Sequence, residues 1–399
     1  MPARAGELKK ETMYKGYRYI DSDSHILEPE DIWERYLEPE FREEAPRTVA
    51  HWISAAEHGL PEEIDGVAYH QETHVAGESM PAFDTGYPIP GAFQLPGCAE
   101  VYDEYRQMGF SPEVYKLVLE RSGIDYMVLY PTAGLTMNCA VGIKPQQAAA
   151  HCRAYNNWLA DFCRGSDPRL VGIAAIDLRD PAIAAAEAQR CVRELGFHGV
   201  QINPEPLPDV PPIQDPRYDD LWSTIEELGV PVAIHLAPIS PHNVARYYFG
   251  PWHMGIGASA FILGNMSASV SLILGGVLER HPRLRIVHLE TGCGWVPFWL
   301  ERMEAGILGS TRGVVPLDLS PREYFQRQCC VAADPDDPWI PQFIETMGDE
   351  CLVTNTDFGH PEGKGYVHAI DDTLALQGVA EASLRKMMWD NAAELYGLS

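Results

Sequence analysis

Short apolar runs alternate along the chain with longer segments whose apolar residues recur at helical spacing. The short runs are apolar on both faces, which is typical of parallel strands covered by helices, and they lie at 17–22, 124–130, 170–176, 197–202, 230–234, 284–287, 328–332 and 351–354. The helical patterns lie at 146–163, 181–195, 218–228, 267–280, 295–303, 338–347 and 381–396. This alternation predicts an α/β fold of the (β/α)8 TIM-barrel type. An open doubly wound sheet is the weaker alternative, because no GxGxxG follows the first strand.

Two connections in this pattern are longer than a simple crossover. Residues 40–118, after the first strand, are rich in Pro and Gly and predict an irregular cap with some helix. Residues 240–265, after the fifth strand, are dense in aromatic side chains and predict a lid loop. The uncharged run 254–278 is long enough to span a bilayer, but Asn265 and several serines and glycines interrupt it, which favours a loop and a buried helix. We therefore expect one domain over residues 1–399.

Composition narrows the class of partner. Lys and Arg total 30 against 57 Asp and Glu, a net charge of -27 that repels nucleic acid and anionic membranes. We expect a small-molecule substrate instead. Nine cysteines without a CxxC pair, and an N-terminal stretch without an apolar signal segment, predict a cytoplasmic protein with reduced thiols. The aromatic helix that begins at Trp295 favours a homodimer.

Histidines and carboxylates fall where several predicted strands end. In the stretch YIDSDSHILEP, the side chains two residues apart point the same way, into the mouth of a barrel. Such side chains on rigid strands supply the nitrogen and oxygen donors that a divalent metal needs. The candidates on strands one, five, six and eight are Asp23, His25, His235, His288, Glu290 and Asp357.

Several further residues have two open interpretations. Glu28 is either a helix N-cap or a metal ligand, and Glu290 either orients His288 or binds metal. His253 and His360 are loop histidines that contact substrate or serve structure. Aromatic residues of the fifth-strand loop predict an apolar wall for substrate, formed by Tyr247, Tyr248 and Trp252 among others.

The order and spacing of several motifs resemble the amidohydrolase-related family of the "amidohydrolase 2" type, which includes aminocarboxymuconate semialdehyde and γ-resorcylate decarboxylases. These motifs include YIDSDSHILEP, GVPVAIHLA, HPRLRIVHLETGCGWVPFWLERME and TNTDFGHPEG. The resemblance implies metal ligation by Asp23, His25, His235 and Asp357, with His288 as catalytic acid/base or a further ligand. The family's usual first motif is His-x-His. Asp23 in its place shifts the metal preference from Zn towards Mn or Fe.

Three functions are compatible with this resemblance. The leading expectation is a nonheme diiron monooxygenase that hydroxylates a hydrophobic, in some cases CoA-linked, intermediate with one or two Fe ions, using His288 and Glu290 in catalysis. The alternatives are a Mn-, Zn- or Fe-dependent hydrolase and a nonoxidative decarboxylase of an aromatic or enoic acid. A barrel kept only as a binding scaffold belongs to a different class, which the near-complete donor set disfavours.

Overall fold

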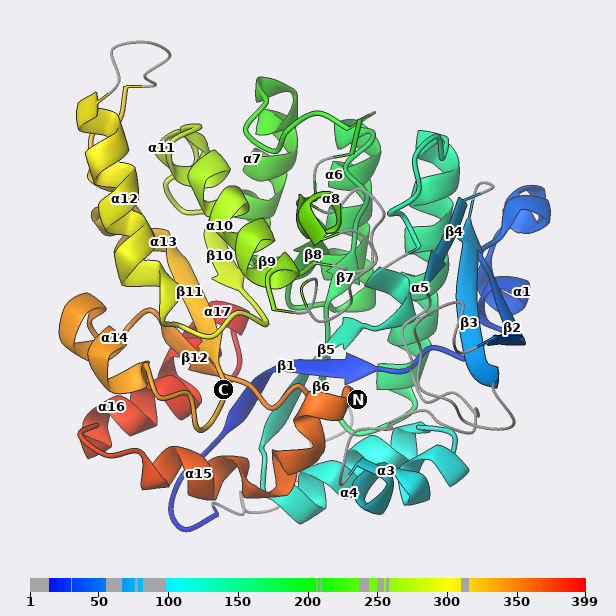
Figure 1. Ribbon diagram of the computed structural model, residues 1–399, viewed down its shortest axis with the longest axis horizontal. Coiled ribbons are helices and arrows are strands. Elements are labelled where there is room, and N and C mark those ends of the chain that lie inside the picture. The colour runs from blue at the N-terminus through cyan, green and yellow to red at the C-terminus, as the bar shows by residue number, and fades with distance from the viewer. Residues whose placement is uncertain are drawn as a thin grey trace, which may run out of the picture.

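The computed structural model describes residues 14–29, 31–54, 67–75, 78–81, 98–135, 137–205, 207–208, 210–236, 244–249, 255, 258–309 and 316–399. Parallel strands occupy its centre and helices surround them (Figure 1). The central strands are β1 (Ile20–Ile26), β5 (Tyr126–Pro131), β6 (Leu170–Gly172), β7 (Ala174–Ala175), β8 (Val200–Ile202), β9 (Pro231–Ile234), β10 (Arg285–His288), β11 (Cys329–Ala333) and β12 (Leu352–Thr354). Each lies within or overlaps a predicted strand segment.

The strands pair in chain order. One sheet runs β1-β5-β6 and another runs β7 to β12, and β6 and β7 are successive parts of a single predicted strand, interrupted at Ile173. The first and last strands also meet, because the N–H of Asp357 donates to the carbonyl of Asp23 at 2.9 Å and Ser24 forms a parallel bridge with Phe358. The sheet therefore curls round on itself, as the TIM-barrel prediction requires.

Helices cover the outer face of these strands (Figure 1). Their apolar faces and the outward side chains of the strands form one large core, while alternate strand residues, including Ile20, Val128, Ala233, Val287 and Val353, form a separate interior cluster. The helices are α1 (Ile32–Tyr36), α3 (Cys98–Gln107), α4 (Pro112–Ser122), α5 (Pro145–Arg164), α6 (Pro181–Arg190), α7 (Asp219–Leu228), α8 (Val244–Phe249), α10 (Ala260–Ile273), α11 (Val277–Arg280), α12 (Trp295–Gly309), α13 (Pro321–Gln328), α14 (Ile340–Met347), α15 (Ala369–Ala375), α16 (Glu381–Arg385) and α17 (Asn391–Tyr396).

The long connection after β1 corrects one prediction. Where the sequence predicted an irregular cap with some helix, the helix is present as α3 and α4, but described residues before it form a small antiparallel sheet of β2 (Arg47–Ser54), β3 (Val67–Val75) and β4 (Glu78–Pro81). Figure 1 shows this sheet at the right edge of the molecule, beside α1. The connection then ends in α3 and α4.

The uncharged run after β9 includes α10, whose end at Ile273 is followed by the short α11. In the part of the chain that the structure describes, no helix has both the length and the apolar character needed to cross a membrane.

Candidate metal centre

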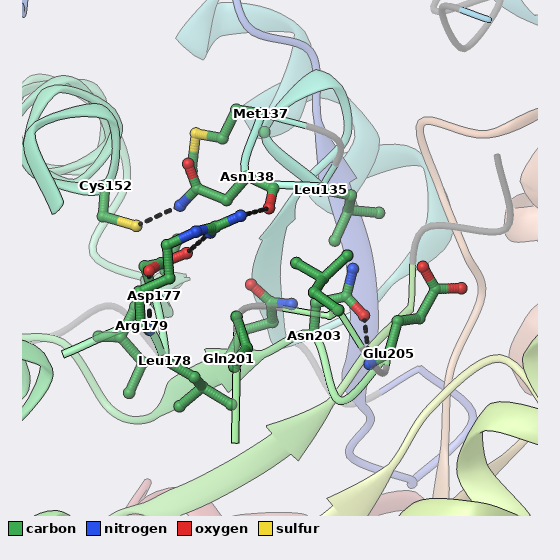
Figure 2. Close-up of a pocket in the computed structure, with 15 residues that line it drawn as sticks. Leu135, Met137, Asn138, Cys152, Asp177, Leu178, Arg179, Gln201, Asn203 and Glu205 are labelled. Atoms are coloured by element: carbon green, nitrogen blue, oxygen red, sulfur yellow. Dashed lines mark hydrogen bonds and ion pairs between the residues drawn. The ribbon is translucent and has the colours of Figure 1, made fainter. Parts of the chain in front are cut away.

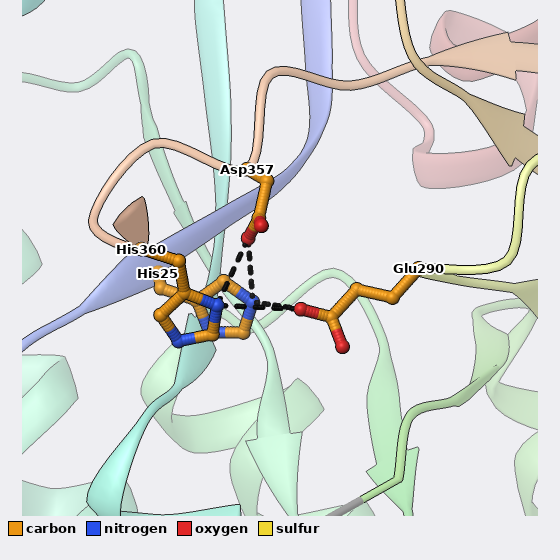
Figure 3. A group of neighbouring side chains, drawn as sticks. All are labelled: His25, Glu290, Asp357 and His360. Carbon is orange, nitrogen blue, oxygen red and sulfur yellow. Dashed lines mark hydrogen bonds and ion pairs between the residues drawn. The ribbon is translucent and has the colours of Figure 1, made fainter. Parts of the chain in front are cut away.

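Metal-capable side chains converge where β1, β9, β10 and β12 end. Asp23, His25 and His235 form one group, and His25, Glu290, Asp357 and His360 form a second. Within each group, the potential ligand atoms all lie within 4.8 Å of one another. Figure 3 shows the second group, in which Glu290 approaches the stacked rings of His25 and His360 from one side and Asp357 from another.

His25 and His235 face each other through their Nε2 atoms, which lie 3.2 Å apart. The Nδ1–H of His25 donates to the carbonyl of Pro131 at 2.8 Å, and that of His235 to the carbonyl of Leu236 at 3.2 Å. Burial, with a contribution from nearby His360, lowers both pKa values, that of His235 to about 3. Both rings are therefore neutral, and both Nε2 atoms carry lone pairs. Lone pairs this close repel each other unless a cation binds both.

Asp23 adds a carboxylate to the two histidines. Its Oδ1 lies 3.6 Å from Nε2 of His25 and 3.8 Å from Nε2 of His235. Neither carboxylate oxygen makes a hydrogen bond to a described residue, although the side chain is fully buried. Burial, followed by the charges of Glu290 and Asp357, holds the pKa of Asp23 well above its usual range. Ligands at about 2.1 Å from a divalent ion lie about 3.0–3.5 Å apart. The two histidine nitrogens fall within this range, and Asp23 Oδ1 lies slightly beyond it.

Glu290 and Asp357 reach the site from an unusual backbone conformation. Both have φ of 54°, in the left-handed region that non-glycine residues rarely adopt. The resulting turns place Oε1 of Glu290 3.7 Å, and Oδ1 of Asp357 3.4 Å, from Nε2 of His25. Strained residues of this kind cluster at functional sites, and here they supply the second and third carboxylates.

Gly359 permits the loop after β12 to approach His25 closely. Its φ is 106°, and a Cβ on this residue would lie 2.5 Å from the carbonyl oxygen of His25. Only glycine avoids that contact and tolerates that φ. The neighbouring Asp357 and His360 are therefore brought to the donor set by a glycine-dependent turn.

His360 stacks on His25, with ring centroids 3.6 Å apart and an interplanar angle of 17°. Its Nδ1 lies 3.0 Å from Oδ1 of Asp357 and 3.3 Å from Oε1 of Glu290. Its Nε2 lies 3.3 Å from the hydroxyl of Thr132. Burial lowers the pKa of His360, but the two carboxylates outweigh burial and raise it well above its usual value. His360 thus holds a proton at Nδ1 between two carboxylates.

His288 does not join either group, contrary to the sequence-based expectation. Its neighbour Val287 lies in the interior cluster, so His288 points to the outer face of β10. There its Nδ1–H donates to Oδ1 of Asn265 at 2.8 Å, and its ring stacks on Phe325. Burial lowers its pKa to about 3. The left-handed turn at Glu290 breaks the period-two pattern that placed both side chains in the mouth.

Glu28 also lies outside both groups. Its carboxylate accepts backbone N–H bonds from Thr132, Ala133 and Gly134 at 3.1, 3.0 and 2.9 Å. Glu28 therefore stabilises the loop after β5. This role differs from both the helix N-cap and the metal ligand that the sequence suggested. Burial raises its pKa to about 7.

The predicted aromatic wall falls only partly on described residues. Tyr247 and Tyr248 lie on α8 with exposed fractions of 86% and 73%, so their rings face solvent. Trp252 and His253 lie outside the described residues. Substrate contact by these four residues stays a prediction.

A polar pocket lies between the loops after β5, β7 and β8 (Figure 2), and one of its lining residues, Gln201, donates to the carbonyl of His235. We call it the β8 pocket; its polar lining includes Asn138, Asp177, Arg179, Gln201, Asn203 and Glu205. The sequence analysis did not identify it. The sequence pattern that could have identified it is the series of polar residues two apart at the end of β8, namely Gln201, Asn203 and Glu205.

Two curated relatives cover most of this chain. It is 24% identical over 290 residues to 2-amino-3-carboxymuconate-6-semialdehyde decarboxylase of Dictyostelium discoideum, covering 72% of this chain and 77% of the relative. It is 25% identical over 293 residues to a γ-resorcylate decarboxylase of Polaromonas, covering 71% and 86%.

Solved structures share the fold. An amidohydrolase from Mycobacterium avium subsp. paratuberculosis aligns with a TM-score of 0.75 at 22% identity, over 96% of this chain and 99% of that one. A 5-carboxyvanillate decarboxylase from Novosphingobium aromaticivorans, solved with bound manganese, aligns with a TM-score of 0.67 at 18% identity, over 96% and 98%.

These relatives correct the leading functional expectation. Both curated relatives are decarboxylases, which are lyases, so the predicted diiron monooxygenase and the ranking of an oxidoreductase first are wrong. The error arose because a carboxylate-rich donor set can hold the metal of an oxygenase as well as that of a decarboxylase. A family model described as Amidohydrolase matches residues 22–398, nearly the whole chain. The chain therefore belongs to the amidohydrolase family.

Proposed function

We propose that this protein is a metal-dependent, nonoxidative decarboxylase of an aromatic or enoic carboxylic acid. The observation that carries the proposal is the pair of neutral histidines, His25 and His235, whose Nε2 atoms face each other at 3.2 Å beside the buried carboxylate of Asp23. This arrangement fits a divalent cation. The decarboxylase relatives support the reaction type.

The donor set favours one ion. His25 belongs to both metal-capable groups, and its Nδ1 is already bonded to the carbonyl of Pro131. Only Nε2 is left to bind metal, so the two groups overlap in a single site. We propose Asp23, His25, His235 and Asp357 as ligands, with Glu290 as a further donor. Several hard carboxylates among these ligands favour manganese, and iron and zinc are the alternatives.

Nonoxidative decarboxylation breaks the bond between the carboxylate carbon and its neighbour. CO₂ leaves, and a proton takes its place on the remaining carbon, so no oxidant or reductant is needed. A bound divalent ion supplies Lewis-acid stabilisation of negative charge on the substrate.

The residues of this chain provide the remaining functions. His360 holds a proton at Nδ1 between Asp357 and Glu290, and it is the group best placed to deliver that proton. Glu28 fixes the loop that carries Thr132, whose hydroxyl lies near the other ring nitrogen of His360. Burial of the donor set limits access of water.

The test is CO₂ release under argon by protein loaded with one equivalent of manganese. The panel contains 2,6-dihydroxybenzoate (γ-resorcylate), 5-carboxyvanillate and 2-amino-3-carboxymuconate semialdehyde. We expect CO₂ from at least one acid, lost after metal removal and restored by manganese. Asp23→Asn is the matched variant that keeps side-chain shape but weakens metal binding. Hydrolysis or hydration products without CO₂ would overturn the proposal.

A further inference from the structure

Asp21 is a buried carboxylate on β1 that belongs to neither metal-capable group. Its Oδ1 accepts the N–H of Thr356 at 2.8 Å and that of Asp23 at 3.4 Å. Its Oδ2 accepts the hydroxyl of Ser24 at 2.6 Å and the hydroxyl of Thr356. A carboxylate has about four lone-pair sites for hydrogen bonds. These donors occupy them, so Asp21 acts on groups of the protein rather than on a metal ion.

The bonds of Asp21 connect the first barrel strand to the last. Asp23 and His25 lie on β1, whereas Thr356 lies in the loop after β12, immediately before Asp357. Both oxygens of Asp21 take part, because one accepts the backbone N–H of Thr356 and the other accepts its hydroxyl. The carboxylate therefore holds the start of the loop that carries Asp357 against the strand that carries the other donors.

Thr356 extends this restraint across Asp357. The hydroxyl oxygen of Thr356, which donates to Asp21, also accepts the N–H of Phe358 at 3.2 Å. One hydroxyl thus bonds to the residue after Asp357, while the residue before it is held by Asp21. The φ of Asp357 is 54°, and such a conformation persists only where the surrounding contacts hold it. The bonds of Asp21 and Thr356 are contacts of this kind.

The geometry of the donor set depends on how these two strands are joined. Oδ1 of Asp357 lies 3.4 Å from Nε2 of His25, and the two atoms come from different ends of the sheet. A divalent ion binds its ligands at about 2.0–2.2 Å, so it is sensitive to small changes in their spacing. Groups that orient metal ligands from behind typically change metal affinity by roughly 10- to 100-fold when they are removed.

We propose that Asp21 and Thr356 together set the position of Asp357 relative to the metal ligands on β1. Both are positioning residues, because they act through the ligands and contact neither the ion nor the substrate. This inference rests on the metal centre of the proposed function, but it does not depend on which acid the protein decarboxylates.

Thr356 offers a matched pair of substitutions. Thr356→Val keeps the shape and removes the hydroxyl, whereas Thr356→Ser keeps the hydroxyl. Calorimetry measures manganese affinity, and low-temperature EPR of bound Mn²⁺ measures the zero-field splitting, which reports the arrangement of ligands rather than overall stability. We expect Thr356→Val to weaken affinity by roughly 10- to 100-fold and to change the splitting. Thr356→Ser should keep both close to the wild-type values.

Asp21→Asn should cause the same changes, because an amide nitrogen cannot accept the hydrogen bonds that a carboxylate oxygen accepts. Combined with Thr356→Val, it should weaken affinity no more than the larger single effect, because both remove one connection. Thr373→Val is the control. It removes a buried hydroxyl that donates to the carbonyl of Ala369 in α15, and it should keep the wild-type affinity and splitting.

Wild-type affinity and splitting in Thr356→Val would overturn the inference, whether or not Asp21→Asn folds. Equal losses in Thr356→Ser or in Thr373→Val would also overturn it, because the effect would then not come from this hydroxyl. Failure of the proposed decarboxylation appears separately, as intact acids in the CO₂ assay of a wild-type protein that binds manganese. A wild type that binds no manganese would overturn both.

Discussion

Replacing Asp23 with asparagine should make the metal-free protein more stable and weaken its affinity for metal. The Asp23 side chain is fully buried, and its oxygens make no hydrogen bond to a described residue. The carboxylates of Glu290, Asp357 and Asp21 oppose its charge, and His360 offsets only part of their effect. Without a cation, this charge opposes folding. Asparagine keeps the shape and removes the charge, but it is a poorer metal ligand.

The size of the effect follows from the pKa. Burial and then the neighbouring carboxylates raise the pKa of Asp23 well above its usual value of 3.8. Each pKa unit corresponds to about 1.4 kcal/mol, so the cost at pH 7 is at most about 4 kcal/mol. We expect metal-free Asp23→Asn to be about 1–4 kcal/mol more stable than the wild type at pH 7.

The pH dependence has a definite sign. The folded-state pKa of Asp23 lies above the unfolded value, so between the two values the folded protein binds more protons than the unfolded chain. The contribution of Asp23 to stability therefore falls as pH rises from about 4 towards 7. This fall should be absent in Asp23→Asn.

Urea unfolding of chelator-treated protein measures the stability, and manganese titration by calorimetry measures the affinity, which should fall by roughly 100-fold or more. Asp336→Asn, on an exposed loop, is the control and should change stability by less than about 0.5 kcal/mol. A metal-free Asp23→Asn protein that is less stable than the wild type, or that binds manganese equally well, would refute the reasoning.

Three further substitutions test individual parts of the site. Gly359→Ala should reduce stability by about 1–3 kcal/mol and weaken manganese binding, because the added Cβ would lie 2.5 Å from the carbonyl oxygen of His25. An unchanged melting temperature and manganese affinity would contradict this close approach. Glu28→Gln should lower stability by about 1–3 kcal/mol and leave manganese stoichiometry unchanged, and loss of the metal would instead make Glu28 a ligand. His288→Gln should leave both manganese stoichiometry and affinity unchanged, and a tenfold weaker affinity by calorimetry would place His288 in the metal centre.

Much of the fold could be predicted because it depends on local patterns. Apolar runs on both faces identified each barrel strand, and strand order fixed which carboxyl ends meet. Asp23, His25 and His235 could be predicted as neighbours because each lies on or directly after a strand, although the pairing of β1 with β5 is irregular between Asp21 and Ser24. The sheet β2–β4 was missed because the whole connection was interpreted from the Pro- and Gly-rich stretch at 80–97, which follows the sheet, although β2 and β3 themselves contain neither residue.

The rest of the site depends on backbone turns and long-range contacts. His288 was predicted to face the mouth with Glu290, but a left-handed residue at Glu290 redirects the chain, and a two-residue period carries no sign of that turn. Glu28 bonds to backbone groups more than a hundred residues away in the chain. The choice between oxygenase and decarboxylase could not be made from ligand types, because carboxylates and imidazoles serve both.

The central claim is that the protein replaces a substrate carboxylate with a proton from solvent-exchangeable groups. Its most direct test is a reaction of the acid panel with manganese-loaded protein in D₂O under argon, followed by NMR. The account predicts a product with one deuterium at the carbon that carried the carboxylate, together with one equivalent of CO₂. Carboxylates that stay intact in every acid of the panel, or a product that requires O₂, would contradict it.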